Sequence, residues 1–428
     1  MIRPLRSPGK VPLPALLLSM AALGSGCAMP SPKDARAVIA ARAFQSTLPA
    51  YLRPVGHSPV PKGLTGMRAA DCGACHVEIY AEWKESSHAR AFRDDPQFME
   101  ELRKTTATSG RDASWICLNC HTPFEAQLPR LLAGLEKGDR GLPIYVDNPS
   151  FDPRMQEEGV TCATCHVRDG VVLGPTGAGR APHAVQRSDL LHSSDLCLQC
   201  HEVNARIDDV GLVCLFDTGV TYAAGPDAAE GKSCQECHMP EVERPLTNLG
   251  TPPRTTRRHW FGGSLIPKKP EFEAAMAPIR AHYKSGALVA WTDLPEAFPA
   301  GKRATVTFSV TNAEAGHSLP TGDVERHIVI TARLRGSDGT LLAERAERFG
   351  TRYEWYPAAR RLDDTRLGPR ETRTFTLEFE APSRGTVTLE LEGVHVRMTA
   401  ENVAYHGLEG RTVPSRTFLD SREERPVR

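Results

Sequence analysis

The sequence predicts an α + β protein, in which a mostly helical and irregular domain precedes a small antiparallel β-sandwich. The 428 residues suffice for two domains that each bury a core. Five C-x-x-C-H pentapeptides lie within residues 72–238, and that spacing suits one turn of a helix. After about residue 285 the motifs stop and apolar residues alternate with polar ones, as at Val306, Phe308 and Val310.

Residues 1–27 have the pattern of a secretory signal peptide. A basic start precedes an apolar run over residues 11–23, which is too short to span a bilayer. Small residues directly before Cys27 are typical of a lipoprotein cleavage site, at which Cys27 becomes the lipidated first residue. We therefore expect an exported protein held by lipid at Cys27, with plain secretion as the alternative. No later apolar stretch is long enough for a transmembrane helix.

Residues 28–70 are expected to form a linker. Six prolines fall in this segment, and only residues 35–44 have a pattern that favours a short helix. The predicted organisation is therefore a signal peptide over 1–27, a linker over 28–70, a motif-bearing domain over 71–285 and a β-sandwich over 286–428.

Ten of the 12 Cys form the five motifs, which end in a His each time. The motifs are Cys72–Cys75–His76, Cys117–Cys120–His121, Cys162–Cys165–His166, Cys197–Cys200–His201 and Cys234–Cys237–His238. C-x-x-C-H is the attachment motif of c-type haem, in which the two thiols add to the haem vinyl groups and the His ligates iron. Zinc sites or redox C-x-x-C pairs do not require a His after every second Cys. The sequence therefore predicts five covalently attached haem c groups.

Each haem iron has a sixth position, which a second His fills in electron-transfer haems. Ten His lie outside the motifs, which is enough to supply a sixth ligand to each of the five irons. The candidates are His88, His183, His259 and His317, and the fifth ligand is one of His192, His282 or His57. His88 lies in a helical pattern over residues 77–92. On a continuous helix it would lie about 18 Å from His76, so we expect it to serve a neighbouring haem.

One loop of the predicted sandwich, Gly316-His317-Ser318-Leu319-Pro320-Thr321-Gly322, differs from its surroundings. Its Pro and two Gly restrict the backbone and could hold His317 rigidly. The simple interpretation is an ordinary hairpin loop. The stronger hypothesis is that the sandwich supplies His317 as an iron ligand to a haem of the first domain. Such a bond would hold the two domains together through the metal.

The motif region resembles multihaem c-type cytochromes of the superfamily that includes the nitrifiers' tetrahaem cytochrome and hydroxylamine oxidoreductase. The resemblance rests on Cys72–His76 followed by Trp83, Ser87 and His88, on Gly159–His166, on Cys234–Pro240 and on the loop of His317. It implies mostly bis-His haems, with His88 and His317 as distal ligands. All five motifs here end in His, whereas related nitrite-reducing pentahaem enzymes carry a Lys in one motif.

We therefore expect an electron-transfer protein of the periplasm or outer membrane, with other redox proteins as donor and acceptor. The alternative is an oxidoreductase with one five-coordinate haem acting on a small nitrogen or sulfur compound. Docking or self-assembly through the sandwich is a third hypothesis. Fifty-two basic and 52 acidic side chains give no formal net charge, which argues against nucleic-acid binding.

Overall fold

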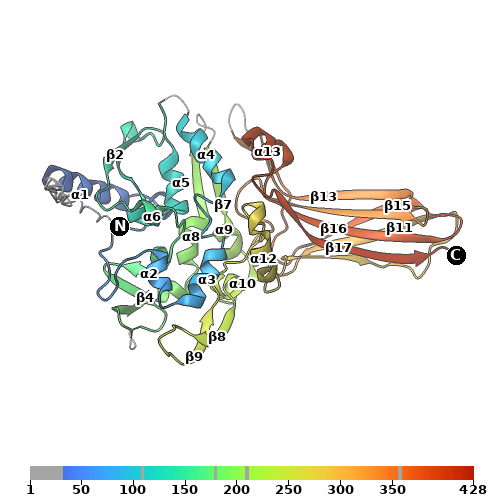
Figure 1. Cartoon of the computed structure of the whole chain (residues 1–428). Helices are drawn as coiled ribbons and strands as arrows, with labels where there is room; N and C mark the ends of the chain where they lie inside the picture. Colours follow the sequence, from blue (N-terminus) through green and yellow to red (C-terminus); the bar gives the residue numbers. More distant parts are fainter. Residues whose placement is uncertain (1–31, 108–109, 178–180, 208–211, 355–358) are drawn as a thin grey trace, which may run out of the picture.

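The structure is a computed structural model that describes residues 32–107, 110–177, 181–207, 212–354 and 359–428. The predicted signal peptide and Cys27 lie outside the described residues. The chain contains short helices and several small sheets, and the predicted α + β class is confirmed. Figure 1 shows the helical part at one end and an elongated pair of sheets at the other. Within the described residues, no helix has the length and apolar character needed to cross a membrane.

The segment expected as a linker is packed against the helical part over much of its length. Helix α1 (Pro32–Ser46) lies against strand β1 (Arg130–Leu135), and it buries Val38 and Ala41 there. Leu52, from the short turn after α1, is 2% exposed in a second small core. The linker interpretation of residues 28–70 is therefore wrong for this part, because apolar side chains at these positions have a core to enter.

Four of the five motifs lie on a short helix, as the spacing predicts, whereas the first begins on a helix and ends in the turn that follows it. The motif helices are α2 (Ala69–Gly73), α5 (Ser114–His121), α7 (Cys162–His166), α8 (Asp195–His201) and α11 (Cys234–His238). Between them lie α3 (Val77–Glu85), α4 (Pro96–Ala107), α6 (Pro153–Gln156), α9 (Thr218–Ala223) and α10 (Pro226–Ala229). A capping box starts α11, where the Glu236 carboxylate accepts from the backbone N–H of Ser233.

The loops of the helical part contain small sheets that the sequence interpretation did not specify. Antiparallel hairpins join β1 to β2 (Pro143–Asp147), β6 (Glu202–Ile207) to β7 (Leu212–Asp217), and β8 (Glu241–Pro245) to β9 (Pro253–Arg257). A further small sheet contains β3 (Val167–Arg168), β4 (Val171–Gly174) and β5 (Val185–Arg187). These sheets hold the connections between motifs in defined positions.

The C-terminal part has two sheets that share one core. A three-stranded sheet contains β10 (Ala287–Thr292), β11 (Arg303–Asn312) and β15 (Thr372–Glu380). The five-stranded sheet has the order β14 (Arg360–Asp364), β13 (Leu341–Glu354), β12 (His327–Gly336), β16 (Thr386–Val396) and β17 (Ser415–Pro426). Neighbouring strands are antiparallel, and Phe308 and Ile330 are fully buried between the sheets.

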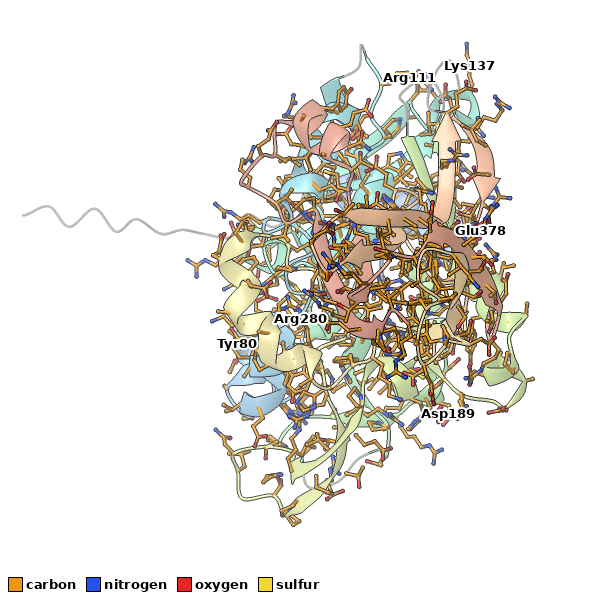
Figure 2. The ribbon with its side chains drawn as sticks, turned by 90° about the vertical axis from the view of Figure 1, so that its right-hand side faces the viewer. Tyr80, Arg111, Lys137, Asp189, Arg280 and Glu378 are labelled. Atoms are coloured by element: carbon orange, nitrogen blue, oxygen red, sulfur yellow. The ribbon has the colours of Figure 1, made fainter. Side chains whose placement is uncertain are left out.

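Helices α12 (Glu273–Arg280) and α13 (Ala400–His406) lie at the junction between the two parts in Figure 1. Figure 2 views the molecule from the sandwich end, with Glu378 on the sandwich, Arg280 on α12 and Tyr80 on the helical part. The Arg366 guanidinium crosses this junction and donates two hydrogen bonds of 2.7 Å to the Asp217 carboxylate. The junction therefore has a fixed polar contact.

Candidate functional site

Three motif histidines face a second histidine at the same spacing. The ring centres of His201 and His88, of His166 and His259, and of His238 and His317 are each 6.3 Å apart. A metal–imidazole bond is about 2 Å long and the ring centre lies about 1 Å further on, so two axial imidazoles have centres about 6 Å apart. The three pairs therefore fit a haem iron between two histidines.

His76 lies near a further candidate histidine, His183, although no ring contact joins the two. The charge of His183 acts on His76 and, after burial, helps to hold the pKa of His76 below its usual value. Gly63 fixes the backbone at His183: its φ is +95°, and a Cβ there would lie 2.1 Å from the Pro182 carbonyl oxygen. Only glycine permits this approach. The loop of His183 is thus held against the segment that precedes the first motif.

The hydrogen bonds of the imidazoles leave their Nε2 atoms for a metal. Nδ1 lies 3.0 Å from the Leu246 carbonyl oxygen in His76 and 3.0 Å from the Leu173 carbonyl oxygen in His166. Backbone carbonyl oxygens also meet the Nδ1 atoms of His121, His238, His259 and His317. A carbonyl oxygen can only accept, so each Nδ1 carries the proton and Nε2 keeps its lone pair. Metal-ligating histidines are usually oriented in this way.

Burial keeps these rings neutral, as iron ligation requires. Loss of solvent lowers the pKa of His88 to about 3 and the pKa values of His121, His201 and His259 to about 4. Burial likewise lowers the pKa values of His166 and His317. At neutral pH these imidazoles are therefore uncharged.

A buried ion cluster positions His259. The Glu82 carboxylate on α3 accepts from Arg244 Nη1 at 2.7 Å and Nη2 at 3.1 Å, and from Arg258 Nη1 at 2.5 Å. Its Oε2 also accepts from the backbone N–H of His259 at 2.9 Å. Glu82 is 6% exposed and Arg244 is 3% exposed. The carboxylate thus holds the chain at positions 258 and 259.

The loop of His317 packs on the helical part beside α9. The backbone N–H of Ser318 donates to Thr221 Oγ1 at 3.3 Å, and the hydroxyls of Thr321 and Thr218 lie 2.8 Å apart. The His238 and His317 rings are within 7° of parallel. The sandwich therefore places His317 beside His238 of the fifth motif, and ligation of a haem by His317 stays a prediction.

His121 of the second motif differs from the other four. Its ring stacks on Phe98 of α4 with a centre distance of 3.7 Å and an interplanar angle of 8°. Within the described residues no ring contact joins His121 to another histidine, whereas His166, His201 and His238 each have one. The three candidates for the fifth ligand have other surroundings: His57 lies 3.5 Å from the Glu125 carboxylate, His282 packs on Trp260, and His192 is exposed.

The motif cysteines of different helices lie next to one another. The thiol of Cys72 is within hydrogen-bonding reach of Cys162, Cys120 of Cys200, and Cys197 of Cys234. The charge of Cys200 also acts on Cys165. The first motif therefore adjoins the third, the third adjoins the fourth, and the fourth adjoins both the second and the fifth.

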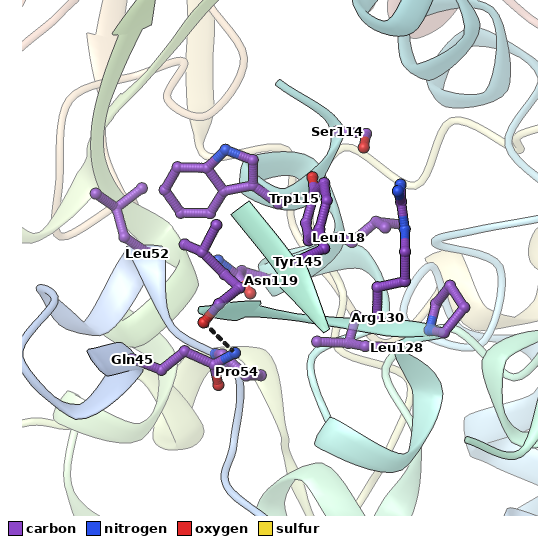
Figure 3. A pocket seen from close by; sticks show the side chains of 12 residues that line it. Gln45, Leu52, Pro54, Ser114, Trp115, Leu118, Asn119, Leu128, Arg130 and Tyr145 are labelled. Carbon is purple, nitrogen blue, oxygen red and sulfur yellow. Dashed lines mark hydrogen bonds between the residues drawn. The ribbon is translucent and has the colours of Figure 1, made fainter. Parts of the chain in front are cut away.

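One cavity among the described residues, of about 500 Å³, is bordered by Arg42, Arg53, His57, Glu125 and Arg168, and also by Gln199 of the fourth motif. Cofactor sites have volumes in this range. Its arginines outnumber its one carboxylate, although Arg42 is paired with Glu125. Figure 3 shows a much smaller pocket, of about 40 Å³, between Trp115, Leu52 and Tyr145. That volume holds only a few water molecules.

Gly159, just before the third motif, packs closely against the loop of His88, as Gly63 does against the loop of His183. Its φ is +63°, and a Cβ there would lie 2.6 Å from the His88 carbonyl oxygen, which also accepts from the Val160 N–H at 2.9 Å. We expect Gly159→Ala to displace His88 from its place opposite His201. The expected result is loss of one low-spin haem signal in the electron paramagnetic resonance (EPR) spectrum and a gain of high-spin signal.

Gly138→Ala is the matched control, because Gly138 also has a positive φ, of +77°, but a Cβ there meets nothing within 4 Å. Both variants carry the same kind of backbone strain. An unchanged low-spin signal in Gly159→Ala, or equal loss in both variants, would contradict the role given to this contact.

The structure corrects the sequence interpretation a second time, at the helix expected around His88. A continuous helix over residues 77–92 is wrong: α3 ends at Glu85, and Ser86 is extended with ψ of 159°. The Ser86 hydroxyl accepts from the backbone N–H of Ala89 at 3.2 Å, a local bond that competes with the helix. His88 therefore lies in a turn, opposite His201 of another motif.

Several residues that position the site were missed from the sequence. Glu82, Arg244 and Gly63 resemble ordinary surface or loop residues, and no motif singles them out. Only the Gly-rich and Pro-rich context of Gly63 carried a weak turn signal.

Comparisons with known proteins bear on the first two motifs and on the fold. Residues 71–136 match the family model described as cytochrome c554 and c-prime. A penta-haem cytochrome c552 from Thermochromatium tepidum has a similar structure, with a TM-score of 0.57 and 20% identity, over 86% of this chain and 100% of that one. The CARDB domain of a Pyrococcus furiosus protein matches 33% of this chain and 87% of its own, with 16% identity and a TM-score of only 0.17. No curated protein matches the chain.

The likeness to the penta-haem cytochrome shows the fold, and the family match covers the first two motifs. Together with the C-x-x-C-H motifs, the structural likeness and the family match support a multihaem c-type cytochrome that transfers electrons through covalently bound haem c.

Proposed function

We propose that this chain is a pentahaem electron-transfer cytochrome in which four haems have bis-His ligation. The observation that carries the proposal is the recurring 6.3 Å spacing between a motif histidine and a second histidine. The proposed pairs are His76 with His183, His166 with His259, His201 with His88, and His238 with His317. Bis-His ligation leaves no site for substrate and suits electron transfer.

The proposed route follows the neighbouring cysteines. Haems one, three, four and five would form a continuous series, because Cys72 adjoins Cys162, Cys165 lies near Cys200, and Cys197 adjoins Cys234. The second haem would branch from the fourth, where Cys120 adjoins Cys200. A branched array lets electrons reach the second haem through the fourth one.

The setting of His121 favours a second candidate function. Its ring has Phe98 as its stacking neighbour, and the described residues place no second histidine opposite it. A haem with one protein ligand can bind a small molecule at the sixth position. We propose that the second haem is five-coordinate, so that the protein is an oxidoreductase for a small nitrogen or sulfur compound, with the other haems delivering or removing electrons.

EPR and magnetic circular dichroism of the oxidised holoprotein test both proposals. We expect four low-spin bis-His haems and one high-spin haem, and we expect cyanide to convert only the high-spin signal. A spectrum with five low-spin haems and no response to cyanide would contradict the oxidoreductase proposal and would be consistent with electron transfer alone. More than one high-spin haem would contradict the four bis-His pairs.

We also propose that the protein is exported, attached to a membrane by lipid at Cys27, and exchanges electrons with other redox proteins of the periplasm or outer membrane. The sequence before and at Cys27 supports this location. Incorporation of labelled palmitate that persists in Cys27→Ser would contradict the lipid anchor. Self-assembly through the sandwich is the remaining alternative for its partners.

A further inference from the structure

A group of largely buried charged side chains lies between the helical part and the sandwich; we call it the junction cluster. It contains three cations, Lys268, Arg326 and Arg397, and four carboxyl groups, Asp95, Glu101, Asp323 and Glu325. The cations and carboxyls act on one another electrostatically, which places them in one neighbourhood. Asp95 and Glu101 come from the helical part, whereas Asp323–Arg326 and Arg397 come from the sandwich.

Some members of the junction cluster have internal partners. Lys268 Nζ pairs with the Asp95 carboxylate, and Asn402 Nδ2 donates to Glu325 Oε1. Arg397 Nη2 donates to Thr412 Oγ1, and that hydroxyl donates to the Lys268 carbonyl oxygen at 3.3 Å. These contacts fix the positions of Lys268 and Arg397 relative to each other.

Arg397 still lacks partners for most of its donors. The residue is 3% exposed, yet its Nε and Nη1 have no hydrogen-bond partner among the described residues. Arg326 Nε, His395 Nε2 and Glu325 Oε2 are also buried without a partner. An unpaired buried guanidinium is strongly destabilising. The geometry therefore requires an acceptor that the described protein atoms do not supply.

The charge balance of the junction cluster favours an anionic acceptor. Burial raises the pKa of Glu101 to about 8 and the pKa of Glu325 to about 7, so that Glu101 is mostly protonated and Glu325 about half protonated at neutral pH. Three cations then face four carboxyl groups, of which Glu101 is mostly neutral and Glu325 only partly charged. The cluster therefore favours a further anionic partner.

The junction cluster borders the second and fourth motifs. Lys268 acts electrostatically on His121 and His88, and Arg326 acts on His201. Glu101 acts on Cys117, the first thiol of the second motif. An anion at Arg397 would therefore lie close to the second haem.

We propose that Arg397 and Arg326 form an anion site that the sandwich supplies to the haem attached at Cys117 and Cys120. Its ligand is a carboxylate or a small oxyanion, which accepts charge-assisted hydrogen bonds from the free Nε or Nη1 of Arg397 and from the free Nε of Arg326. Two sources have this chemistry: a propionate of the haem itself, or a free oxyanion such as nitrite or sulfite. The second source rests on the five-coordinate haem proposed above.

The test uses the holoprotein with Arg397→Gln, Arg326→Gln and Arg397→Lys. Arg384→Gln is the control, because Arg384 is exposed in the turn between β15 and β16. Two measurements are made: redox titration of every haem without added anion, and titration of the high-spin haem with nitrite, sulfite and cyanide. Arg397→Lys keeps the positive charge but removes the planar guanidinium group. This variant therefore remains informative if Arg397→Gln does not take up haem.

A propionate ligand predicts a tenfold shift of the redox equilibrium of one haem in Arg397→Gln, about 59 mV, toward a lower potential, with unchanged nitrite affinity. A free oxyanion predicts unchanged potentials, about tenfold weaker nitrite or sulfite binding, and unchanged cyanide binding. The proposal is overturned if the Arg397 and Arg326 variants match Arg384→Gln in both measurements. If the wild-type protein does not bind cyanide, the proposal of a five-coordinate haem is wrong. The anion site is still tested in that case, because the redox shift expected for a propionate ligand does not require an open iron position.

Discussion

His317→Ala is expected to convert one low-spin haem of the holoprotein to a high-spin haem and to change no other haem. His317 comes from the sandwich, and its ring lies 6.3 Å from that of His238 and nearly parallel to it. Alanine would remove the proposed sixth ligand of the haem at Cys234 and Cys237. Axial ligands set haem potentials over a range of roughly 0.8 V, so this haem should also shift by a large amount in a redox titration.

The nearly parallel rings make this haem identifiable. The other measured pairs have interplanar angles of 30° and 48°, against 7° for His238 and His317. Low-spin EPR signals depend on this angle, so the signal of the most parallel pair should be the one that disappears. His406→Ala on α13 is the control, because the His406 Nδ1 has a partner in Lys104 Nζ at 3.1 Å and no motif histidine opposite it.

Two outcomes decide the role of His317. Loss of the near-parallel signal in His317→Ala alone supports ligation across the junction. An unchanged count of low-spin haems would contradict it, and the loop would then be a docking contact held by Ser318, Thr321 and the Arg366–Asp217 pair. Added imidazole should restore the signal in the first case, because it can fill the vacated position.

Local features of this fold could be predicted from the sequence. The motif helices follow from a five-residue pattern that needs one helical turn, and the sandwich strands follow from alternation such as that of β11. The end of α3 at Glu85 could not be predicted, because the apolar pattern continues past it. The Ser86 hydroxyl and the close approach of Gly159 stop the helix there, and the second of these contacts depends on tertiary packing.

Pairings between distant residues were the least predictable part of the site. His88 and His201 are far apart in the chain, as are His166 and His259, and spacing along a chain does not say which rings meet. His317 was a strong candidate because its loop is unusual, whereas the absence of a histidine opposite His121 in the described residues had no sequence signal. Ten histidines lie outside the motifs, so their number alone is consistent with a second histidine ligand on every one of five haems.

Glu82→Gln is expected to destabilise the holoprotein strongly and to disturb the haem held between His166 and His259. Glu82 is the shared acceptor of Arg244, which is 3% exposed, and of Arg258. Glutamine keeps the volume of the side chain but removes its charge, which leaves the buried Arg244 guanidinium with only the exposed Glu78 carboxylate, 4.0 Å away, as a counter-ion. Breaking a buried pair in this way costs about 3–5 kcal/mol. We expect the thermal midpoint to fall by roughly 10 °C.

The spectroscopic effect follows from the backbone contact. Glu82 Oε2 accepts from the His259 N–H at 2.9 Å, and an amide oxygen or nitrogen at this position would hold the chain less firmly. The low-spin signal of the pair with the 30° angle should therefore broaden or shift, while the His238–His317 signal stays unchanged.

Glu78→Gln separates this effect from a general change of charge on α3. Glu78 lies one turn earlier on the same helix, is 60% exposed at its side chain and approaches Arg244 only to 4.0 Å. Exposed pairs contribute about 0–1 kcal/mol, so this variant should melt within about 2 °C of the wild type. Equal midpoints for Glu78→Gln and Glu82→Gln would show that Arg244 finds another counter-charge, and the positioning role of Glu82 would then be wrong.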